Sequence, residues 1–352
     1  MPKPFLSPIC LTYGLTRSLN PSSVNAQRSA SWSPEDCCPY HSCSDEPLSQ
    51  ELLTRPSLSV VIPNYNHADC LPTAVRAIME QSVKPNEVLI VDDGSTDNSK
   101  HVISNLAAQW YPTIRPYFLN RNCGPTHATN FGIDLSKSDY IFITCSDDEI
   151  LPGFFERSLN LLAVNPQAGL CCTVGDWREQ SGFNWLMGKG MSRYPCYISP
   201  TEMIKLERAA RFYIPGHTCI MRRDALIEVG KCIPELRMAN DWFNNYLIGF
   251  TYGICYIPEP LAVYNIHPDS YYKRCRRDPA LYRQVLNELM NRLTQNRHWT
   301  ACNRILEAGS LYSLGLGIIP VLYRGYRRFL TATFLRKCLT HALKRAIKNL
   351  VS

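Results

Sequence analysis

The sequence predicts an α/β fold, in which helices cover both faces of a central sheet. Three short apolar segments carry this prediction, at residues 58–66, 88–97 and 140–149. Each is rich in β-branched and aromatic residues and ends abruptly in polar or acidic ones, as expected for a strand that is buried on both faces. Helical patterns at residues 69–81 and 98–110 separate the first strands, and this βαβ order favours a parallel sheet.

The remaining elements follow from periodicity and from helix-start and helix-stop residues. The helix at 69–81 is expected to begin with Asp69 as its cap and with Pro72 in its first turn. The same criteria predict a strand at 115–119, helices at 152–164, 223–230, 279–295 and from 300, strands at 168–174 and 217–221, a helix start near 238, and an irregular region at 175–200.

Four carboxylates follow the predicted strands: Asp92, Asp93, Asp147 and Asp148. Open α/β sheets bind ligands beyond the carboxyl ends of their strands. Acids gathered there repel one another unless a cation or hydrogen-bond donors are present, so the pattern indicates a metal and a polar ligand. The alternative is that these are turn and helix-cap acids, which are common. Neither a Gly-x-Gly-x-x-Gly nor a Gly-x-x-x-x-Gly-Lys segment follows the first strand, which argues against dinucleotide and P-loop sites.

Three segments together resemble the donor-binding half of glycosyltransferase family 2. They are Ser-Val-Val-Ile-Pro-Asn-Tyr-Asn at 59–66, Val-Asp-Asp-Gly-Ser-Thr-Asp at 91–97 and Ser-Asp-Asp-Glu at 146–149. The resemblance covers residues 57–175 well and continues more weakly to 275. It implies a GT-A fold, which is a Rossmann-like mixed sheet flanked by helices, here with a helical C-terminal extension. It also implies inverting transfer of a sugar from a nucleotide diphosphate donor to a hydroxyl acceptor, with Mg²⁺ or Mn²⁺ as cofactor.

The resemblance assigns roles to particular residues. Those implied for the donor are Pro63, Asn64, Tyr65, Asn66, Asp92, Asp93 and Asp147. Within this set, Asp93 would bind the base and ribose together with Pro63 and Tyr65, with Asp92 as a supporting neighbour, and Asp147 would face the ribose. Asp148 is the implied metal ligand, because the departing diphosphate needs a cation.

A later segment, Tyr264-x-x-His267-x-x-Ser270, resembles a closing element of the family, in which the histidine lies near the metal or the diphosphate. His267 is therefore the second implied metal residue, with a surface or packing role as the alternative. The basic residues at 273–277 would then cover the phosphates, unless they are simply a solvated run of charge.

Asp241 is the candidate catalytic base, because inverting transfer needs a carboxylate to accept the proton of the attacking hydroxyl. It stands where the family has Glu-Asp, with Asn240 in place of the glutamate. A neutral neighbour should keep the pKa of Asp241 lower. A helix cap at Asn240 or Asp241 is the structural alternative. A Gln-x-x-Arg-Trp segment is absent, so we expect transfer of one sugar per encounter.

The segment at 120–132 is similar to the Asn-x-Gly segment of the family, where a turn precedes a helix. The usual Ala-Arg-Asn is Ala128-Thr129-Asn130 here. A basic residue is therefore missing from the donor pocket, unless His127 or another residue replaces it. Aromatic residues at 175–200 can stack on sugar rings or anchor the loop to the core.

The net charge of +7 is concentrated at the C-terminus, where residues 301–352 hold nine Lys or Arg and one acid. From Tyr323 onward apolar residues such as Phe329, Phe334, Leu335 and Leu339 alternate with basic ones, which predicts a helix lying on an anionic membrane surface. The uncharged run at 308–323 is too short to span a bilayer. Nucleic acid is not an expected partner, because no reading module is present.

Residues 1–56 are rich in Ser and Pro, which predicts a poorly ordered extension. A secretory signal is the alternative, but prolines in the apolar run argue against it. The sixteen cysteines are scattered, so we expect reduced, mostly buried thiols, Cys145 and Cys171 among them. Reduced thiols favour a cytoplasmic location, which includes peripheral binding to the inner face of the membrane. The cluster at 37–43 lacks a second ligand pair, which argues against structural zinc.

The predicted organisation is an extension at 1–56, a glycosyltransferase domain at 57–275 with a donor-binding half (57–150) and an acceptor half (151–275), and a basic helical region at 276–352. The predicted partners are a nucleotide-sugar donor (UDP-, dTDP- or GDP-linked) and a glycan or lipid-linked acceptor. A non-catalytic nucleotide-sugar or glycan binder with the same fold is the alternative function.

Overall fold

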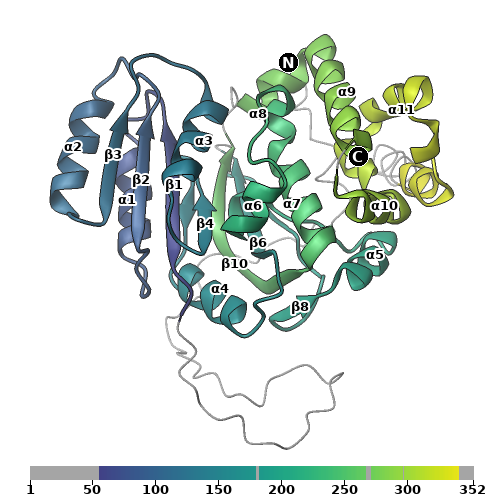
Figure 1. Cartoon of the computed structure of the whole chain (residues 1–352), viewed down its shortest axis with the longest axis horizontal. Coiled ribbons are helices and arrows are strands. Elements are labelled where there is room, and N and C mark those ends of the chain that lie inside the picture. The colour runs from purple at the N-terminus through teal and green to yellow at the C-terminus, as the bar shows by residue number, and fades with distance from the viewer. Residues whose placement is uncertain (1–54, 180–181, 267–270, 296, 341–352) are drawn as a thin grey trace, which may run out of the picture.

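A ten-stranded mixed sheet runs through the centre of the computed structural model, which describes residues 55–179, 182–266, 271–295 and 297–340 (Figure 1). The strands are β1 Leu58–Asn64, β2 Glu87–Asp92, β3 Ile114–Phe118, β4 Tyr140–Ile143, β5 Glu149–Ile150, β6 Leu170–Glu179, β7 Asn184–Met187, β8 Cys196–Ile198, β9 Ile220–Arg222 and β10 Ile254–Ile266. Their order is β3-β2-β1-β4-β9-β6-β10-β5, with β7 beside β6 and β8 beside β10.

The first four strands are parallel, as the sequence predicts. β1 pairs with β2 on one side and with β4 on the other, and β3 is the edge strand beside β2. β9 is antiparallel to both β4 and β6, which makes the sheet mixed. The carboxyl ends of β1, β2 and β4 therefore lie side by side at one edge.

Helices cover both faces of this sheet (Figure 1). They are α1 Leu71–Met79, α2 Ser99–Gln109, α3 Pro125–Leu135, α4 Phe154–Ala163, α5 Pro200–Arg208, α6 Arg223–Glu228, α7 Asn240–Tyr252, α8 Tyr271–Arg277, α9 Pro279–Gln295, α10 Trp299–Ala308 and α11 Ile319–Gly325. Alternate residues of β1 point to opposite faces: Val60 and Ile62 pack with α1, α2 and α4, and Val61 faces the core on the α3 side. This two-sided burial explains the continuous apolar runs of the sequence.

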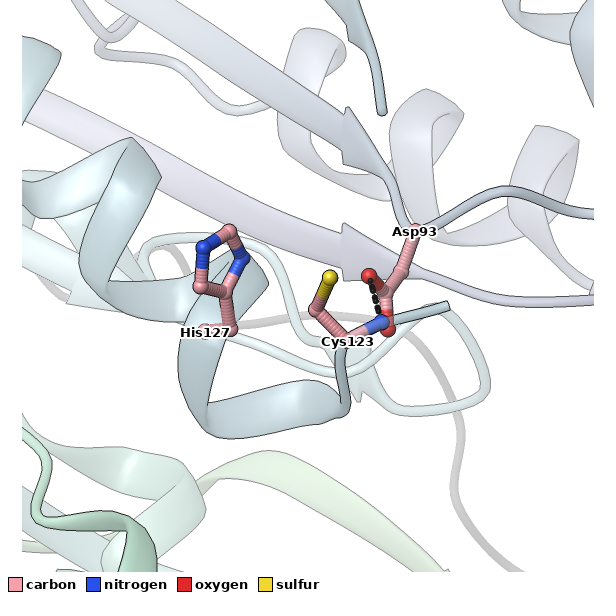
Figure 2. A group of neighbouring side chains, drawn as sticks. All are labelled: Asp93, Cys123 and His127. Atoms are coloured by element: carbon pink, nitrogen blue, oxygen red, sulfur yellow. Dashed lines mark hydrogen bonds between the residues drawn. The ribbon is translucent and has the colours of Figure 1, made fainter. Parts of the chain in front are cut away.

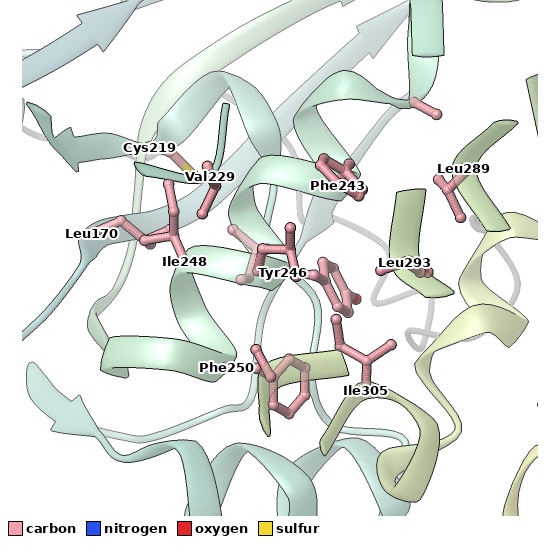
Figure 3. Close-up of a cluster of buried hydrophobic side chains, with 14 of the residues drawn as sticks. Leu170, Cys219, Val229, Phe243, Tyr246, Ile248, Phe250, Leu289, Leu293 and Ile305 are labelled. Carbon is pink, nitrogen blue, oxygen red and sulfur yellow. The ribbon is translucent and has the colours of Figure 1, made fainter. Parts of the chain in front are cut away.

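The larger core lies around α7, whose buried residues contact the sheet on one side and the C-terminal helices on the other (Figure 3). Phe243 and Tyr246 of α7 belong to the same cluster as Leu289 and Leu293 of α9 and as Ile305 of α10. Tyr246 is 1% exposed. The C-terminal helices thus stabilise the helix that carries Asp241.

Several local predictions are wrong. Cys70, rather than Asp69, is the N-cap residue of α1, and it makes no side-chain capping bond. Residues 216–218 form a 3₁₀ turn and β9 starts only at Ile220, because Thr218 Oγ1 donates to Pro215 O and bends the chain there. The region expected to be irregular contains β7 and β8.

The C-terminal segment also differs from the prediction of one amphipathic surface helix. α11 ends at Gly325, a 3₁₀ turn follows at Arg327–Phe329, and a new helical stretch starts at residue 332. Phe329 and Phe334 are buried in the α7 core instead of facing outward. Among the helices that the structure describes, none combines the length and the apolar character needed to cross a membrane.

Candidate active site

The polar ends of three parallel strands form the floor of the candidate site. Asn64 and Asp92 are paired in register at the ends of β1 and β2. On the other side of β1, Thr144 follows β4 and its N–H donates to Val61 O at 3.1 Å. Neighbouring strands are about 4.8 Å apart, so the residues that follow β2 and β4 lie roughly 10 Å from each other across β1.

Asp92 and Asn64 hold this floor together. Asp92 is fully buried, and its carboxylate accepts hydrogen bonds from Asn64 Nδ2 at 2.9 Å and from the N–H and hydroxyl of Ser95. These bonds fix the turn after β2. Asp92 and Asn64 thus hold the ends of β1 and β2 together, and their implied part in donor binding stays a prediction.

Tyr65 and Asn66 are exposed at this edge, whereas Asp93 is buried beneath it. The carboxylate of Asp93 accepts the N–H groups of Cys123 and Gly124 at 2.9 and 2.8 Å, which links the end of β2 to the start of α3. Asn66 Oδ1 accepts the N–H of Thr96 at 2.8 Å. The ring of Tyr65 is 41% exposed at this edge, and Pro63 is partly exposed beside it.

His127 projects from the first turn of α3 towards Cys123 and Asp93 (Figure 2). It is an exposed nitrogen base close to Asp93, in the part of the site where the sequence lacks the family's arginine. Thr129, which stands in that arginine position, is buried. The side chain of Asn130 is used for the fold, because it bonds the backbone of Cys232 at 2.7 and 3.0 Å.

The loop after β4 carries Asp147 and Asp148. Two contacts position it: the hydroxyl of Ser146 pairs with the ring of His67 from the β1 end, and Asn265 Nδ2 of β10 donates to Asp147 O at 2.9 Å. Asp148 is 7% exposed, and its Oδ1 atom is buried with no hydrogen-bond partner among the described residues. Burial and the charge of Asp147 raise the pKa of Asp148 well above its usual range.

This loop could hold a divalent cation. Ligand atoms of Cys145, Asp147 and Asp148 lie within 4.8 Å of one another. Among the described residues the buried Oδ1 of Asp148 has no hydrogen-bond partner, and burial raises the pKa of this carboxyl, so a bound cation would stabilise its ionised form. Carboxylate oxygens suit Mg²⁺ or Mn²⁺. Cys145 is exposed rather than buried as predicted. Its position directly before the Ser-Asp-Asp segment is the sequence feature that could have identified it as part of this loop.

Asp241 joins this loop from a distant part of the chain. It lies in the first turn of α7, directly against Gly216, where an added Cβ would stand 3.0 Å from Asp241 Oδ2. Its negative charge adds to those that raise the pKa of Asp148 and of Cys145. The charges of Asp241 and Asp148 therefore interact in the folded protein.

The environment of Asp241 differs from the sequence expectation in two ways. The residue is exposed, yet desolvation by the surrounding protein raises the pKa of its carboxyl. The expected lowering by a neutral neighbour is thus outweighed by burial. Neither Asn240 nor Asp241 caps α7, because the amide of Asn240 bonds the backbone of Ile233 and Arg237 instead.

An aromatic cluster extends from these acids along β10, β6 and β7. Tyr264 lies opposite Trp177, and Trp177 lies opposite Trp185 in strand register. Their ring centroids are 5.2 and 5.7 Å apart, and Phe183 continues the row at 5.4 Å from Trp185. Burial raises the pKa of Tyr264, and the charges of Asp148, Asp147 and Asp241 add to this effect. His267 lies outside the described residues, so its implied metal role stays a prediction.

Comparison with known proteins agrees with this geometry. Residues 59–230 match the family model of glycosyl transferase family 2. The GalNAc(5)-diNAcBac-PP-undecaprenol beta-1,3-glucosyltransferase of Campylobacter jejuni is 36% identical over 163 residues, which are 45% of this chain and 50% of that protein. An uncharacterized glycosyltransferase of Nostoc sp. is 34% identical over 214 residues, 60% of this chain and 65% of the relative. The chain thus spans less than two thirds of the length of these relatives.

Solved structures give the same result for the fold. The crystal structure of S. aureus TarS 1-349 in complex with UDP-GlcNAc superposes with a TM-score of 0.60 at 13% identity, over 81% of this chain and 79% of that chain. The crystal structure of TarS 1-349 alone superposes with a TM-score of 0.57 at 14% identity, over 77% of this chain and 74% of that chain. The mixed sheet flanked by helices, the acidic edge and the matched segment lead to one conclusion: residues 59–230 of this chain form a glycosyltransferase family 2 domain with the GT-A fold.

Proposed function

We propose that the protein is an inverting, metal-dependent glycosyltransferase that moves one sugar from a nucleotide diphosphate donor to a hydroxyl of an acceptor. The observation that carries this proposal is that the charge of Asp241 helps to raise the pKa of Asp148, although the two acids come from elements far apart in the chain. A site with one acid for the leaving group and another for the incoming hydroxyl has the two functions that direct displacement requires.

On the donor side, the exposed ring of Tyr65 and the partly exposed Pro63 offer an apolar surface for a nucleobase. The carboxylate of Asp93 is held beside them by two backbone N–H groups, so it is fixed in place to accept hydrogen bonds from the base or ribose. Asn66 shapes the turn, and Asp147 would face the ribose. Base identity is not specified by these contacts, so UDP-, dTDP- and GDP-sugars are all candidate donors.

Asp148 and Asp147 would hold Mg²⁺ or Mn²⁺, and His267 would complete the metal side. A bound cation supplies positive charge that stabilises the departing diphosphate. The residues of the chain prepare for it: the Asp148 carboxylate is desolvated, and its Oδ1 atom has no competing partner among the described residues.

Asp241 would take the proton of the acceptor hydroxyl. As this O–H bond breaks, the oxygen forms its bond to the anomeric carbon on the face opposite the diphosphate, whose bond to that carbon breaks with its electron pair. Inversion follows from this single displacement. A raised pKa suits the role, because a stronger base accepts the proton more readily.

The aromatic cluster Tyr264–Trp177–Trp185–Phe183 would bind the acceptor. It begins next to the three acids and extends outward, and the indole N–H groups of Trp177 and Trp185 have no hydrogen-bond partner among the described residues. Aromatic faces match the C–H faces of sugar rings, so this row would stack on sugars of the acceptor. The name of the C. jejuni relative specifies an undecaprenol-linked glycan acceptor, which supports a lipid-linked or cell-surface glycan here.

A membrane location would suit such an acceptor. Arg327, Arg328 and Arg336 are exposed near Leu335 and Leu339, which are 49% and 62% exposed. This combination of basic and apolar groups fits peripheral binding to the anionic inner face of a membrane. It involves fewer residues than the sequence prediction, because Phe329 and Phe334 are buried.

The test is release of UDP or GDP from a panel of nucleotide sugars with Mn²⁺. We expect turnover that chelation and Asp148→Ala abolish, and an Asp241→Asn variant that binds the donor as wild type does but transfers at least 100-fold more slowly. Donor binding without turnover in the wild type, over the whole panel and with glycan and lipid-linked acceptors present, would instead identify a non-catalytic nucleotide-sugar binder.

A further inference from the structure

A second group of metal-binding side chains lies outside the acidic loop: Asp93, Cys123 and His127. Each offers one ligand atom, and these atoms lie within 4.8 Å of one another. In Figure 2 the thiol of Cys123 lies between the carboxylate of Asp93 and the imidazole of His127. Cys123 and His127 are exposed, so an ion could reach them without opening the core. The proposed transfer reaction needs neither a thiol nor a metal at this position.

The backbone brings the three groups together. Asp93 follows β2 and is fixed by the N–H groups of Cys123 and Gly124. Gly124 has a φ of +93°, a conformation that side chains disfavour, and the chain turns there into α3. His127 then lies in the first turn of α3, with its N–H donating to Gly124 O at 3.1 Å. The carboxylate is thus rigid, while the two exposed side chains can change rotamer.

The ligand set is typical of zinc. Thiolate and imidazole are preferred by Zn²⁺, and one carboxylate is a common third ligand. Ligand atoms of a tetrahedral zinc ion are roughly 3.5 Å apart, so the observed spacing requires only small side-chain rotations. By contrast, Asp147 and Asp148 offer a pair of oxygens suited to Mg²⁺ or Mn²⁺.

We propose that Asp93, Cys123 and His127 form a binding site for Zn²⁺ with one open coordination position. We further propose that an ion bound there excludes the nucleotide, because it occupies the carboxylate that the donor needs. The exclusion of the nucleotide rests on the proposed donor role of Asp93, whereas the zinc site does not depend on it.

Titration with Co²⁺, which reports thiolate ligation through a near-ultraviolet charge-transfer band, tests the site without any activity measurement. We expect wild-type protein to develop this band and Zn²⁺ to abolish it, because Zn²⁺ binds such sites more tightly than Co²⁺. Cys123→Ser should lose the band, and His127→Ala should weaken cobalt binding roughly tenfold or more.

Cys145→Ser is the matched control, because Cys145 is the other exposed thiol in a group of metal-capable side chains. It should keep the band. Absence of a band in the wild type, or a band that survives Cys123→Ser, would overturn the proposed site. Circular dichroism of each variant separates loss of a ligand from loss of the fold.

A second measurement tests whether bound Zn²⁺ excludes the nucleotide. Titration of UDP and of GDP, followed by thermal shift at constant Mn²⁺, should give at least a tenfold higher apparent Kd when Zn²⁺ is present, in wild type but not in Cys123→Ser. If cobalt binds through Cys123 and nucleotide affinity is unchanged, the exclusion is wrong, and so is the donor role of Asp93. If no cobalt binds while glycosyl transfer proceeds, the metal site is wrong and the proposed function stands.

Discussion

The charge of Asp241 contributes to the raised pKa of Asp148, although one residue begins α7 and the other follows β4. Burial is the larger cause, followed by the charge of Asp147. Both acids therefore belong to one electrostatic unit that favours protonation in the absence of a cation. The electrostatic interaction of these two residues is also the basis of the proposed mechanism.

Asp148→Asn should stabilise the protein when no divalent cation is present. The pKa of Asp148 in the folded state lies above its unfolded value, so wild-type stability is highest below the ordinary carboxyl range and falls as the pH rises through the raised pKa. The variant should lose this pH dependence and show a higher Tm at neutral pH. Thermal unfolding from pH 4 to 8 in EDTA measures both effects.

Mn²⁺ should raise the Tm of the wild type increasingly as the pH rises, because the cation binds the ionised carboxylates. Asp148→Asn should remove this shift. Asp134→Asn is the control, since Asp134 is an exposed acid paired with Lys231 away from the site. An unchanged Mn²⁺ shift in Asp148→Asn would contradict the assignment of Asp148 as a ligand.

Gly216→Ala should impair transfer more than donor binding. The added Cβ would lie 3.0 Å from Asp241 Oδ2, so the carboxylate must move by a few tenths of an ångström or more. Displacement of a catalytic group on this scale costs roughly 10- to 100-fold in rate. Steady-state transfer kinetics and a nucleotide titration separate the two effects. Gly325→Ala, where a Cβ meets nothing within 4 Å, should leave both unchanged.

Trp185→Ala should weaken acceptor use and leave donor hydrolysis intact. Loss of one stacking ring costs about 0.5–1.5 kcal/mol, which corresponds to a roughly 2- to 10-fold higher KM for the acceptor. Tyr194→Ala is the matched control, because Tyr194 is an aromatic side chain of the same region that is 54% exposed and absent from the ring contacts of the cluster. Equal acceptor KM values for Trp185→Ala and wild type would remove the cluster from the acceptor site.

Lys337→Met should destabilise the fold strongly. Lys337 Nζ lies 2.8 Å from Glu207 Oε1, and the two side chains are 3% and 1% exposed. Removal of one partner leaves a buried charge and typically costs about 3–5 kcal/mol, whereas Glu207→Leu with Lys337→Met should recover most of the loss. Urea unfolding gives the free energies. Breaking the exposed pair of Arg208 and Glu307 should cost about 0–1 kcal/mol by comparison.

Leu335→Ser together with Leu339→Ser should reduce binding to anionic vesicles without unfolding the protein, because both side chains point to solvent. Co-sedimentation with phosphatidylglycerol vesicles, compared with neutral ones, measures the effect. Truncation at Tyr323 is a poor test, since it removes the buried Phe334 and Lys337. Equal co-sedimentation of the double variant and the wild type would contradict the membrane proposal.

The family, the first parallel strands and the positions of Asp93 and Asp148 could all be predicted from the sequence. Strands buried on both faces leave continuous apolar runs, and their polar ends must meet at one edge. Local sequence failed at Thr218, whose hydroxyl bends the chain, and at Phe334, whose apolar side chain fits a membrane surface and a protein core equally well.

The sequence by itself determined the fold class and the acids at the carboxyl ends of the strands. Hydrophobic periodicity and the residues that start and end each element are local properties of the chain. Only the tertiary structure decided that the charge of Asp241 acts on Asp148, that Cys123 and His127 gather around Asp93, and that Lys337 is buried against Glu207. These relationships depend on how helices pack around the sheet, and packing brings together residues whose separation along the chain carries no signal of their contact.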